Sequence, residues 1–413
     1  MTLTEFAYYL RKYSPLAVLF VIVILIFFLT FKIVEIARPE APVSVAPTPT
    51  PAFGQLPAIT IASARALPQS MEYVMETLEG VPLTATSSAH IFFVPKQTPN
   101  LGFREKANVI AKALQFDVEV MTSRLNPDDE TFTLVDRAKR LIVHIDNFNF
   151  TYAQELDSTV NDYLASMVMP DEQVIKSKAQ DIMRKLNRYP PALAQATHVI
   201  TYIAYRVDTE TGGSVAQIVR SPQEANMVHV DFFLPPIHNV EVVTEDFISS
   251  PNRVVFIPQR TNDDFVIKAQ VAVYEHSEVQ SSVYPLKTGD QVFADLQAGK
   301  GLLIQGFDKI GGKKRVGIRK MYLAYLAPSV YAPYLQPIYV FIGDDDFVAY
   351  VPAVLDSWIQ PLQTPDPIPP TNPPERPPTQ PPTPTVVKAT AEPTAIPTET
   401  QDIPTSVPIP IRR

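Results

Sequence analysis

The chain has 413 residues, a formal net charge of −8 and no cysteine. The absence of cysteine excludes disulfide bonds, thiolate nucleophiles and cysteine-based zinc or iron–sulfur sites. The 35 lysines and arginines are scattered along the chain rather than gathered in a stripe, so nucleic acid is not an expected partner.

An uninterrupted apolar run, PLAVLFVIVILIFFLTF, occupies residues 15–31 and contains no charged side chain. Extended by residues 32–37, it is long enough for an α-helix that spans a bilayer and contacts membrane lipid. A cleaved signal peptide is the alternative, but the run is longer than such segments usually are, and Pro47 blocks the nearest cleavage site. We therefore predict one retained transmembrane helix at residues 15–37.

The charges ahead of this run predict its orientation. Residues 1–14 contain Arg11, Lys12 and the α-amine, and positive flanks favour the cytoplasmic side of a membrane. We therefore expect a cell-membrane protein with a cytoplasmic N-terminus at residues 1–14. Its body and C-terminus are expected on the extracytoplasmic side.

Proline-rich segments lie on both sides of the central body. Residues 38–55 contain five prolines between Pro39 and Pro51, which predicts an extended stalk. In the last 53 residues, 361–413, 17 are proline and few are apolar, so this Pro/Thr-rich tail is predicted to be disordered. A tail of this kind is suited to contact with cell-wall polymer.

Between residues 56 and 360 the sequence alternates amphipathic helices with groups of strands. In the first unit, REKANVIAKALQF places Ala107, Ile110, Ala111 and Leu114 on one helical face, and TFTLVD, RLIVHID and FNFTYA predict strands. The later units open with DEQVIKSKAQDIMRKLNRY and TGDQVFADLQAGKG, each followed by further strand-like runs.

This pattern predicts an α+β fold behind one N-terminal transmembrane helix. We expect repeated helix-plus-antiparallel-sheet modules at residues 56–156, 157–258 and 259–360, because groups of strands joined by short links favour antiparallel pairing.

Two stretches near the end of the body carry a family resemblance. SVYPLKTGDQVFADLQAGKG and MYLAYLAPSVYAPYLQPIYVFIGDDDFVAYVPAV resemble the closing region of the YycH/YycI-type extracytoplasmic proteins and related PepSY-like modules, and KANVIAKALQFDVEV with RLIVHIDNFNFTY is similar to the same module. In that family a helix precedes a curled antiparallel sheet. The resemblance implies a single-pass membrane protein that regulates a sensor kinase or an envelope enzyme through protein contacts. It implies no catalytic residues.

Three consecutive aspartates, Asp344, Asp345 and Asp346, lie between two apolar runs rich in β-branched and aromatic residues. A calcium loop would need oxygen ligands at alternate positions over a longer stretch, whereas consecutive acids point in different directions. The sequence GDDD has the right length for a four-residue hairpin loop, so we predict a solvated turn.

The pairs His144/Asp146 and His229/Asp231 are the candidate metal ligands in this sequence. In each pair the two residues share one face of a predicted strand, and the pairs could ligate a metal if their strands met. The alternative is an antiparallel sheet whose apolar neighbours pack inward while these polar residues face water. We favour this alternative and predict no metal, no cofactor and no catalytic site.

Familiar enzyme motifs do not occur in this chain: it has no nucleophile elbow, phosphate loop or His-Glu-x-x-His helix. We therefore expect a non-enzymatic protein that binds an envelope protein partner, with exposed strand edges as the means of capture. A structural cell-envelope or wall-associated protein is the second hypothesis. A metal-dependent envelope hydrolase that uses the His-x-Asp pairs is the third.

Overall fold

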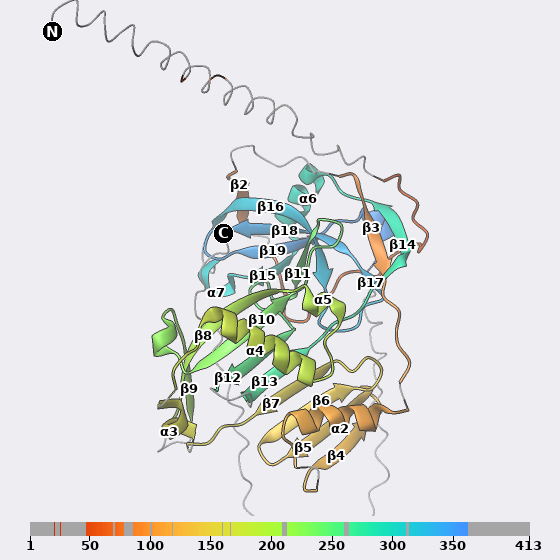
Figure 1. Ribbon diagram of the computed structural model, residues 1–413. Coiled ribbons are helices and arrows are strands. Elements are labelled where there is room, and N and C mark those ends of the chain that lie inside the picture. The colour runs from red at the N-terminus through yellow and green to blue at the C-terminus, as the bar shows by residue number, and fades with distance from the viewer. Residues whose placement is uncertain are drawn as a thin grey trace, which may run out of the picture.

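The computed structural model describes residues 47–361, without 69–70, 78–85, 100, 118, 159, 166, 209–212, 260–263 and 311–313, and also describes Phe20 and Leu25. Strands dominate in these residues, and they form sheets of nine, seven and three strands (Figure 1). The predicted tail after residue 361, the first part of the predicted stalk and nearly all of residues 1–37 lie outside the described residues.

The nine-stranded sheet is antiparallel throughout. Its strands follow the order β4 (Thr122–Asn126), β5 (Thr131–Asp136), β6 (Lys139–His144), β7 (Phe150–Gln154), β13 (Phe265–Val271), β12 (Arg253–Ile257), β10 (Met227–Phe233), β8 (Thr197–Val207) and β9 (Ser214–Val219). Consecutive hairpins build the first four strands. The strand-like runs of the sequence predict β5, β6 and β7 but not β4. The sheet therefore has one edge at β4 and the other at β9.

Short helices cover both faces of this sheet. They are α2 (Phe103–Ala113), α3 (Val160–Ala165), α4 (Glu172–Lys185) and α5 (Pro191–Ala194). α2, α4 and α5 share one core on the same face (Figure 1), and α2 buries Ala107, Ile110 and Ala111 there, on the side that the sequence predicts. α3 packs Leu164 against the opposite face, where alternate strand residues such as Met227 point.

The seven-stranded sheet is mixed. Its path runs β1 (Arg65–Ala66), β15 (Leu302–Gln305), β19 (Val348–Pro352), β18 (Pro337–Gly343), β16 (Arg315–Ala327) and β11 (Glu241–Thr244), and β2 (Glu72–Met75) also pairs with β16. β2 and β11 run parallel to β16. Helix α6 (Gly289–Gln297) packs Val292 and Leu296 into the core on one face, and Thr288 begins the helix with a capping box.

A three-stranded sheet completes this half of the protein. It consists of β14 (Ser277–Pro285), β3 (Ser88–Phe93) and β17 (Tyr334–Leu335) in that order. Three single-turn helices complete the described elements: α7 (Phe307–Ile310), η1 (Pro222–Glu224) and η2 (Asp356–Trp358).

The strands of the three predicted modules are interleaved, which contradicts the predicted fold class. β13, expected in the third module, lies between β7 of the first and β12 of the second. β1, β2 and β3, expected in the first module, pair with β15, β16 and β14 of the third. The fold is corrected to a β-rich one with large, mainly antiparallel sheets and few helices. Periodicity predicts a strand but not its partner, because pairing depends on contacts between distant residues.

The predicted membrane arrangement also requires correction. None of the helices in the described part of the chain has the length and apolar character to cross a membrane. The longest of them, α4, has 14 residues, about 21 Å, and it is amphipathic because one side packs on a sheet. This finding contradicts the predicted single-pass cell-membrane protein with an extracytoplasmic body. The segment 15–37 itself lies outside the described residues, except for Phe20 and Leu25.

Candidate functional site

The two predicted His-x-Asp pairs lie far apart in the structure. His144 ends β6 and Asp146 lies in the turn that follows, whereas His229 and Asp231 lie on β10. Strands β7, β13 and β12 separate β6 from β10, a distance of roughly 19 Å at about 4.8 Å per strand. In the described parts of the chain, no three His, Cys, Asp or Glu side chains are placed to hold a metal ion. The strands therefore do not meet as the metal hypothesis requires.

Both aspartates of these pairs are buried, although we expected them to face water. Asp231 is 3% exposed, and its carboxylate accepts a hydrogen bond from the backbone N–H of Ser250 at 2.8 Å. His229 Nε2 lies 3.3 Å from the same oxygen. Asp146 likewise accepts from the N–H of Asn147 at 2.8 Å. These carboxylates are buried because they satisfy backbone donors in turns.

The three consecutive aspartates form the predicted hairpin turn. β18 and β19 pair antiparallel on either side of it, which confirms the hairpin. Asp345 and Asp346 adopt left-handed φ angles of 59° and 58°, a conformation that aspartate tolerates in turns. Asp344 accepts from Arg319 Nε at 2.9 Å, and Asp346 pairs with Lys309. The acids therefore diverge toward different cations, as expected for consecutive residues.

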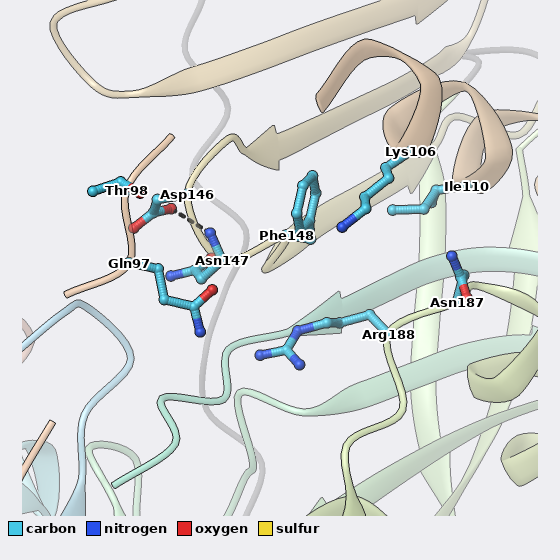
Figure 2. A pocket seen from close by; sticks show the side chains of 9 residues that line it. All are labelled: Gln97, Thr98, Lys106, Ile110, Asp146, Asn147, Phe148, Asn187 and Arg188. Carbon is cyan, nitrogen blue, oxygen red and sulfur yellow. Dashed lines mark hydrogen bonds between the residues drawn. The ribbon is translucent and has the colours of Figure 1, made fainter. Parts of the chain in front are cut away.

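A polar cleft of about 610 Å³ lies where the nine-stranded sheet meets the chain that leaves β3 (Figure 2). Residues from α2, from the β6–β7 turn, from the segment after α4 and from the segment after β3 converge on it. Its lining consists of Gln97, Thr98, Lys106, Ile110, Asp146, Asn147, Phe148, Asn187 and Arg188. Asp146 is the sequence-predicted residue that belongs to this cleft, and it does so without its partner His144.

The β6–β7 turn shapes one wall of the cleft. His144 N–H donates to the carbonyl of Asn149 at 2.8 Å and Phe148 N–H donates to the carbonyl of His144 at 3.0 Å. Asn147 closes the turn by accepting from the N–H of Asn149 at 2.8 Å. Phe148 has a φ of 60°, a left-handed conformation that is strained for an aromatic residue by about 1–3 kcal/mol. This strained geometry places the Phe148 ring in the cleft (Figure 2).

Two cations supply positive charge to the cleft. Lys106 Nζ lies over the Phe148 ring, 4.2 Å from its centroid. The Arg188 side chain is 15% exposed and points into the cleft (Figure 2), where one terminal nitrogen donates to the carbonyl of Val273 at 3.1 Å. Its Nε has no hydrogen-bond partner within the described residues. A buried donor left without an acceptor costs about 1–3 kcal/mol.

A narrower extension continues the cleft toward the other half of the protein. It shares Gln97, Asp146 and Asn147 with the cleft and adds Val94, Pro95, Val273, Tyr274, Glu275 and Tyr331. The Tyr274 and Tyr331 rings meet edge to face with centroids 6.1 Å apart, and the Tyr331 hydroxyl donates to the carbonyl of Val94 at 3.1 Å. Burial raises the pKa of both phenols, so they remain neutral and act as hydrogen-bonding groups.

The lining of the cleft and its extension is mostly polar. The residues named above include carboxamides, carboxylates, cations and phenols, but no histidine, serine or cysteine. The sequence did not reveal Lys106, Phe148 or Arg188 as site residues, because they lie on separate elements. The one local signal was the short polar link between two strand-like runs, which predicted the turn.

Comparison with known proteins assigns this chain to no family. No family model matches the chain, and no curated protein matches it. One similar solved structure is the crystal structure of an uncharacterized protein from Eubacterium rectale ATCC 33656. It has a TM-score of 0.29 and 8% sequence identity, over 65% of this chain and 82% of that chain. The resemblance to YycH/YycI-type proteins stays a prediction.

Proposed function

We propose that this protein is a non-enzymatic binding protein that recognises a segment of a partner polypeptide in the polar cleft. The observation that carries the proposal is that Arg188 lines the cleft while its buried Nε has no hydrogen-bond partner among the described residues. Nearby, the side chains of Gln97, Asn147 and Asn187 line the same space. A carboxamide both donates and accepts, so it matches the alternating donors and acceptors of a peptide backbone.

The distribution of charge suggests how such a segment lies. Lys106 and Arg188 line one part of the cleft, and Asp146 lies with Gln97 in another part (Figure 2). A carboxylate on the partner would pair with Lys106 and would compete for Arg188 with Glu275, whose carboxylate lies 3.6 Å from a terminal nitrogen of Arg188. Donors further along the segment would meet Asp146. Charge-assisted hydrogen bonds of this kind are worth about 1.5–3 kcal/mol each. The partner segment is therefore expected to carry an acidic residue.

Regulation of another protein is one role that such binding supports. The resemblance noted in the sequence implies control of a sensor kinase or another enzyme through protein contacts. A cleft that holds one segment of a partner gives that role a physical basis, since binding would restrain the segment. This role rests on the resemblance and on the cleft together.

A peptide array tests the proposal with a matched pair of variants. An array of random twelve-residue peptides is probed with the wild-type protein and with Lys106→Gln and Lys112→Gln, which change two lysines of the same helix. Lys106 lines the cleft, whereas Lys112 is exposed outside it. We expect peptides rich in Asp and Glu to bind the wild type, with a loss of about tenfold or more for Lys106→Gln and none for Lys112→Gln.

The same experiment has a second variant that separates charge from geometry. Arg188→Lys keeps the positive charge but removes the planar guanidinium and its Nε donor. We expect it to weaken the selected peptides while leaving the folded structure, followed by circular dichroism, unchanged. Failure to select any peptide, or equal binding by all variants, would contradict the proposed function.

A further inference from the structure

The two ends of the described body pair with each other. Leu56, near the N-terminal end, and Ile359, near the C-terminal end, form a parallel β-bridge. The N–H of Leu56 donates to the carbonyl of Trp358 at 2.8 Å, and the N–H of Gln360 donates to the carbonyl of Leu56 at 2.7 Å. The Gln360 side chain also donates to the carbonyl of Gln55 at 3.1 Å. Two segments from opposite ends of the body are therefore joined directly.

The parallel direction of this pairing decides how it responds to tension along the chain. We call residues 55–56 together with residues 357–360 the terminal clasp. A pull toward residue 47 acts on the N-terminal end of one segment, and a pull toward residue 361 acts on the C-terminal end of the other. In parallel segments these two pulls are opposite in direction, so the segments are sheared and their hydrogen bonds carry the load together. Antiparallel segments would instead open one bond at a time.

Apolar packing holds the terminal clasp against the core. The Leu56 side chain is fully buried, and Trp358 and Ile359 pack on the same core. The Tyr284 ring of β14 contacts both ends of the body. It stacks with Phe53 at 6.5 Å between ring centroids and meets Trp358 edge to face at 5.8 Å. The clasp cannot slide without withdrawing this apolar surface from its contacts.

A partly buried charge network fixes the C-terminal segment of the clasp. The Lys287 side chain, just after β14, is 7% exposed, and its Nζ lies 2.6 Å from Asp356 and 2.8 Å from Asp295 of α6. Lys300 lies 2.9 Å from Asp295 and 3.8 Å from Asp356, so two lysines and two aspartates balance each other. Withdrawal of Asp356 would leave an excess positive charge beside the buried Lys287, which is unfavourable.

The N-terminal segment is held along β14 before it reaches the clasp. The N–H of Thr50 donates to the carbonyl of Val283 at 2.9 Å, and the N–H of Ala52 donates to the Ser282 hydroxyl at 2.7 Å. Tension from this side therefore reaches Leu56 after these bonds are loaded. The clasp is the last contact on this path, because the chain beyond Leu56 enters the core.

The path across the terminal clasp bypasses the sheets. Between residues 47 and 361 the load crosses the contact of Leu56 with Ile359, whereas the route along the polypeptide passes through all three sheets. The nine-stranded sheet, which bears the polar cleft, does not lie on the short path.

We propose that the terminal clasp is a mechanical clamp, which lets the body carry tension between the chain segments on its two sides while its sheets stay folded. The clasp resists tension because its bonds are loaded simultaneously and its side chains are fixed by the core and by Lys287. Load reaches the sheets only after the clasp breaks. This role is separate from binding in the polar cleft, and it keeps the cleft intact under load.

Constant-force measurements on the full chain test this proposal. Ala46→Cys and Leu362→Cys supply attachment points on either side of the clasp, since the chain has no cysteine of its own. Gln360→Pro removes the N–H that binds Leu56, and Ile359 already has the extended backbone that a residue before proline adopts, with φ −109° and ψ 132°. We expect this change to shorten the lifetime of the folded state at constant force by about tenfold. An unchanged lifetime would overturn the proposal.

A second pair of attachment points bypasses the clasp. Leu101→Cys lies just before α2 and Val215→Cys lies on β9, and both side chains are exposed. Because tension between these points does not cross the clasp, Gln360→Pro should leave the lifetime unchanged here. Equal effects of Gln360→Pro with both pairs of attachment points would show a general loss of stability and would contradict a clamp.

A matched pair of variants separates the clasp from overall stability. The Asn226 side chain accepts from the N–H of Tyr205 on β8 and donates to its carbonyl, both at 2.9 Å. Asn226→Ala removes these bonds away from the load path, so the lifetime between residues 46 and 362 should not change. Asp356→Asn removes a charge that pairs with Lys287 on the path and should shorten it. A shorter lifetime for Asn226→Ala, or an unchanged one for Asp356→Asn, would overturn the assignment.

Discussion

The two edges of the nine-stranded sheet differ in the burial of the strand beside the edge and in the charge of the edge strand. β4 pairs along its full length with β5, whose Phe132 and Leu134 are buried in the core beneath α2. β9 pairs with the projecting end of β8, whose side chains are mostly half-buried. Figure 1 shows β4 and β9 at opposite ends of the sheet.

The two edge strands also differ in charge. β4 carries Arg124 at its centre, whereas β9 has no charged residue between Ser214 and Val219. A charge in the middle of an edge strand discourages pairing, because an added strand would have to desolvate it. The edge strand β4 therefore carries a charge and pairs with a strand whose side chains are deeply buried. The edge strand β9 carries no charge and pairs with a strand whose side chains are mostly half-buried.

The largest expected effect tests the difference in core support. Leu134→Ala beside β4 removes a fully buried side chain and should lower the free energy of unfolding by about 2–5 kcal/mol. Ile203→Ala beside β9 removes a half-buried one and should cost only about 1 kcal/mol. Urea denaturation followed by circular dichroism measures both. Equal losses of unfolding free energy would show that buried side chains stabilise the β4 end and the β9 end of the sheet to the same extent.

A smaller effect is expected from the asparagines that hold β8. Asn226→Ala leaves the N–H and C=O of Tyr205 without their partners and should reduce stability by about 1–3 kcal/mol. The loss should be local, since β10 still pairs with the other end of β8. Hydrogen exchange should therefore accelerate in β8 and β9 and remain slow in β5 and β6. Equal acceleration of hydrogen exchange in all four strands would contradict the expectation that the β9 end of β8 opens separately from the rest of the sheet.

Replacing the charged residue of β4 should change self-association of the protein more than its free energy of unfolding. Arg124→Val replaces an exposed charge on the edge with a β-branched residue, and we expect the free energy of unfolding to change by no more than about 0.5 kcal/mol. The variant should associate at high protein concentration, because its edge then resembles β9. Light scattering over a concentration series measures this. A monodisperse Arg124→Val protein would mean that charge is not what protects β4.

The smallest expected effect is a pH dependence at His198, in the half of β8 that pairs with β10. Burial, with a further contribution from Lys176, lowers the pKa of the His198 imidazole on β8. The unfolded chain then binds this proton more readily than the folded one, so stability should fall as pH drops below the ordinary histidine pKa of about 6.5. His198→Asn should reduce the difference in stability between pH 7.5 and pH 5.5. An unchanged difference would exclude His198 as its source.

Local parts of this fold could be predicted from the sequence. The helical face of Ala107, Ile110 and Ala111 is buried as its spacing requires, and the GDDD turn joins two paired strands. Both depend on residues within one or two turns of chain. The modules could not be predicted correctly, since β13 inserts between β7 and β12 from a distant part of the sequence.

The candidate site depends even more on distant contacts. Lys106, Asn147 and Arg188 come from three separate elements and meet at the cleft through tertiary packing. The His-x-Asp pairs looked equivalent in the sequence, yet Asp146 lies at this cleft and Asp231 is buried beneath the turn of Ser250. Alternation predicted which face of a strand they occupy, but not what covers that face.

The sequence by itself determined the locations of many strands, the apolar face of α2 and the hairpin at the three aspartates, because these depend on local periodicity and turn chemistry. Only the tertiary structure decided the order of strands in the sheets, the meeting of cations and carboxamides in the cleft and the open edge at β9. These features are set by hydrogen bonding and side-chain packing between residues far apart in the chain, which no local pattern specifies.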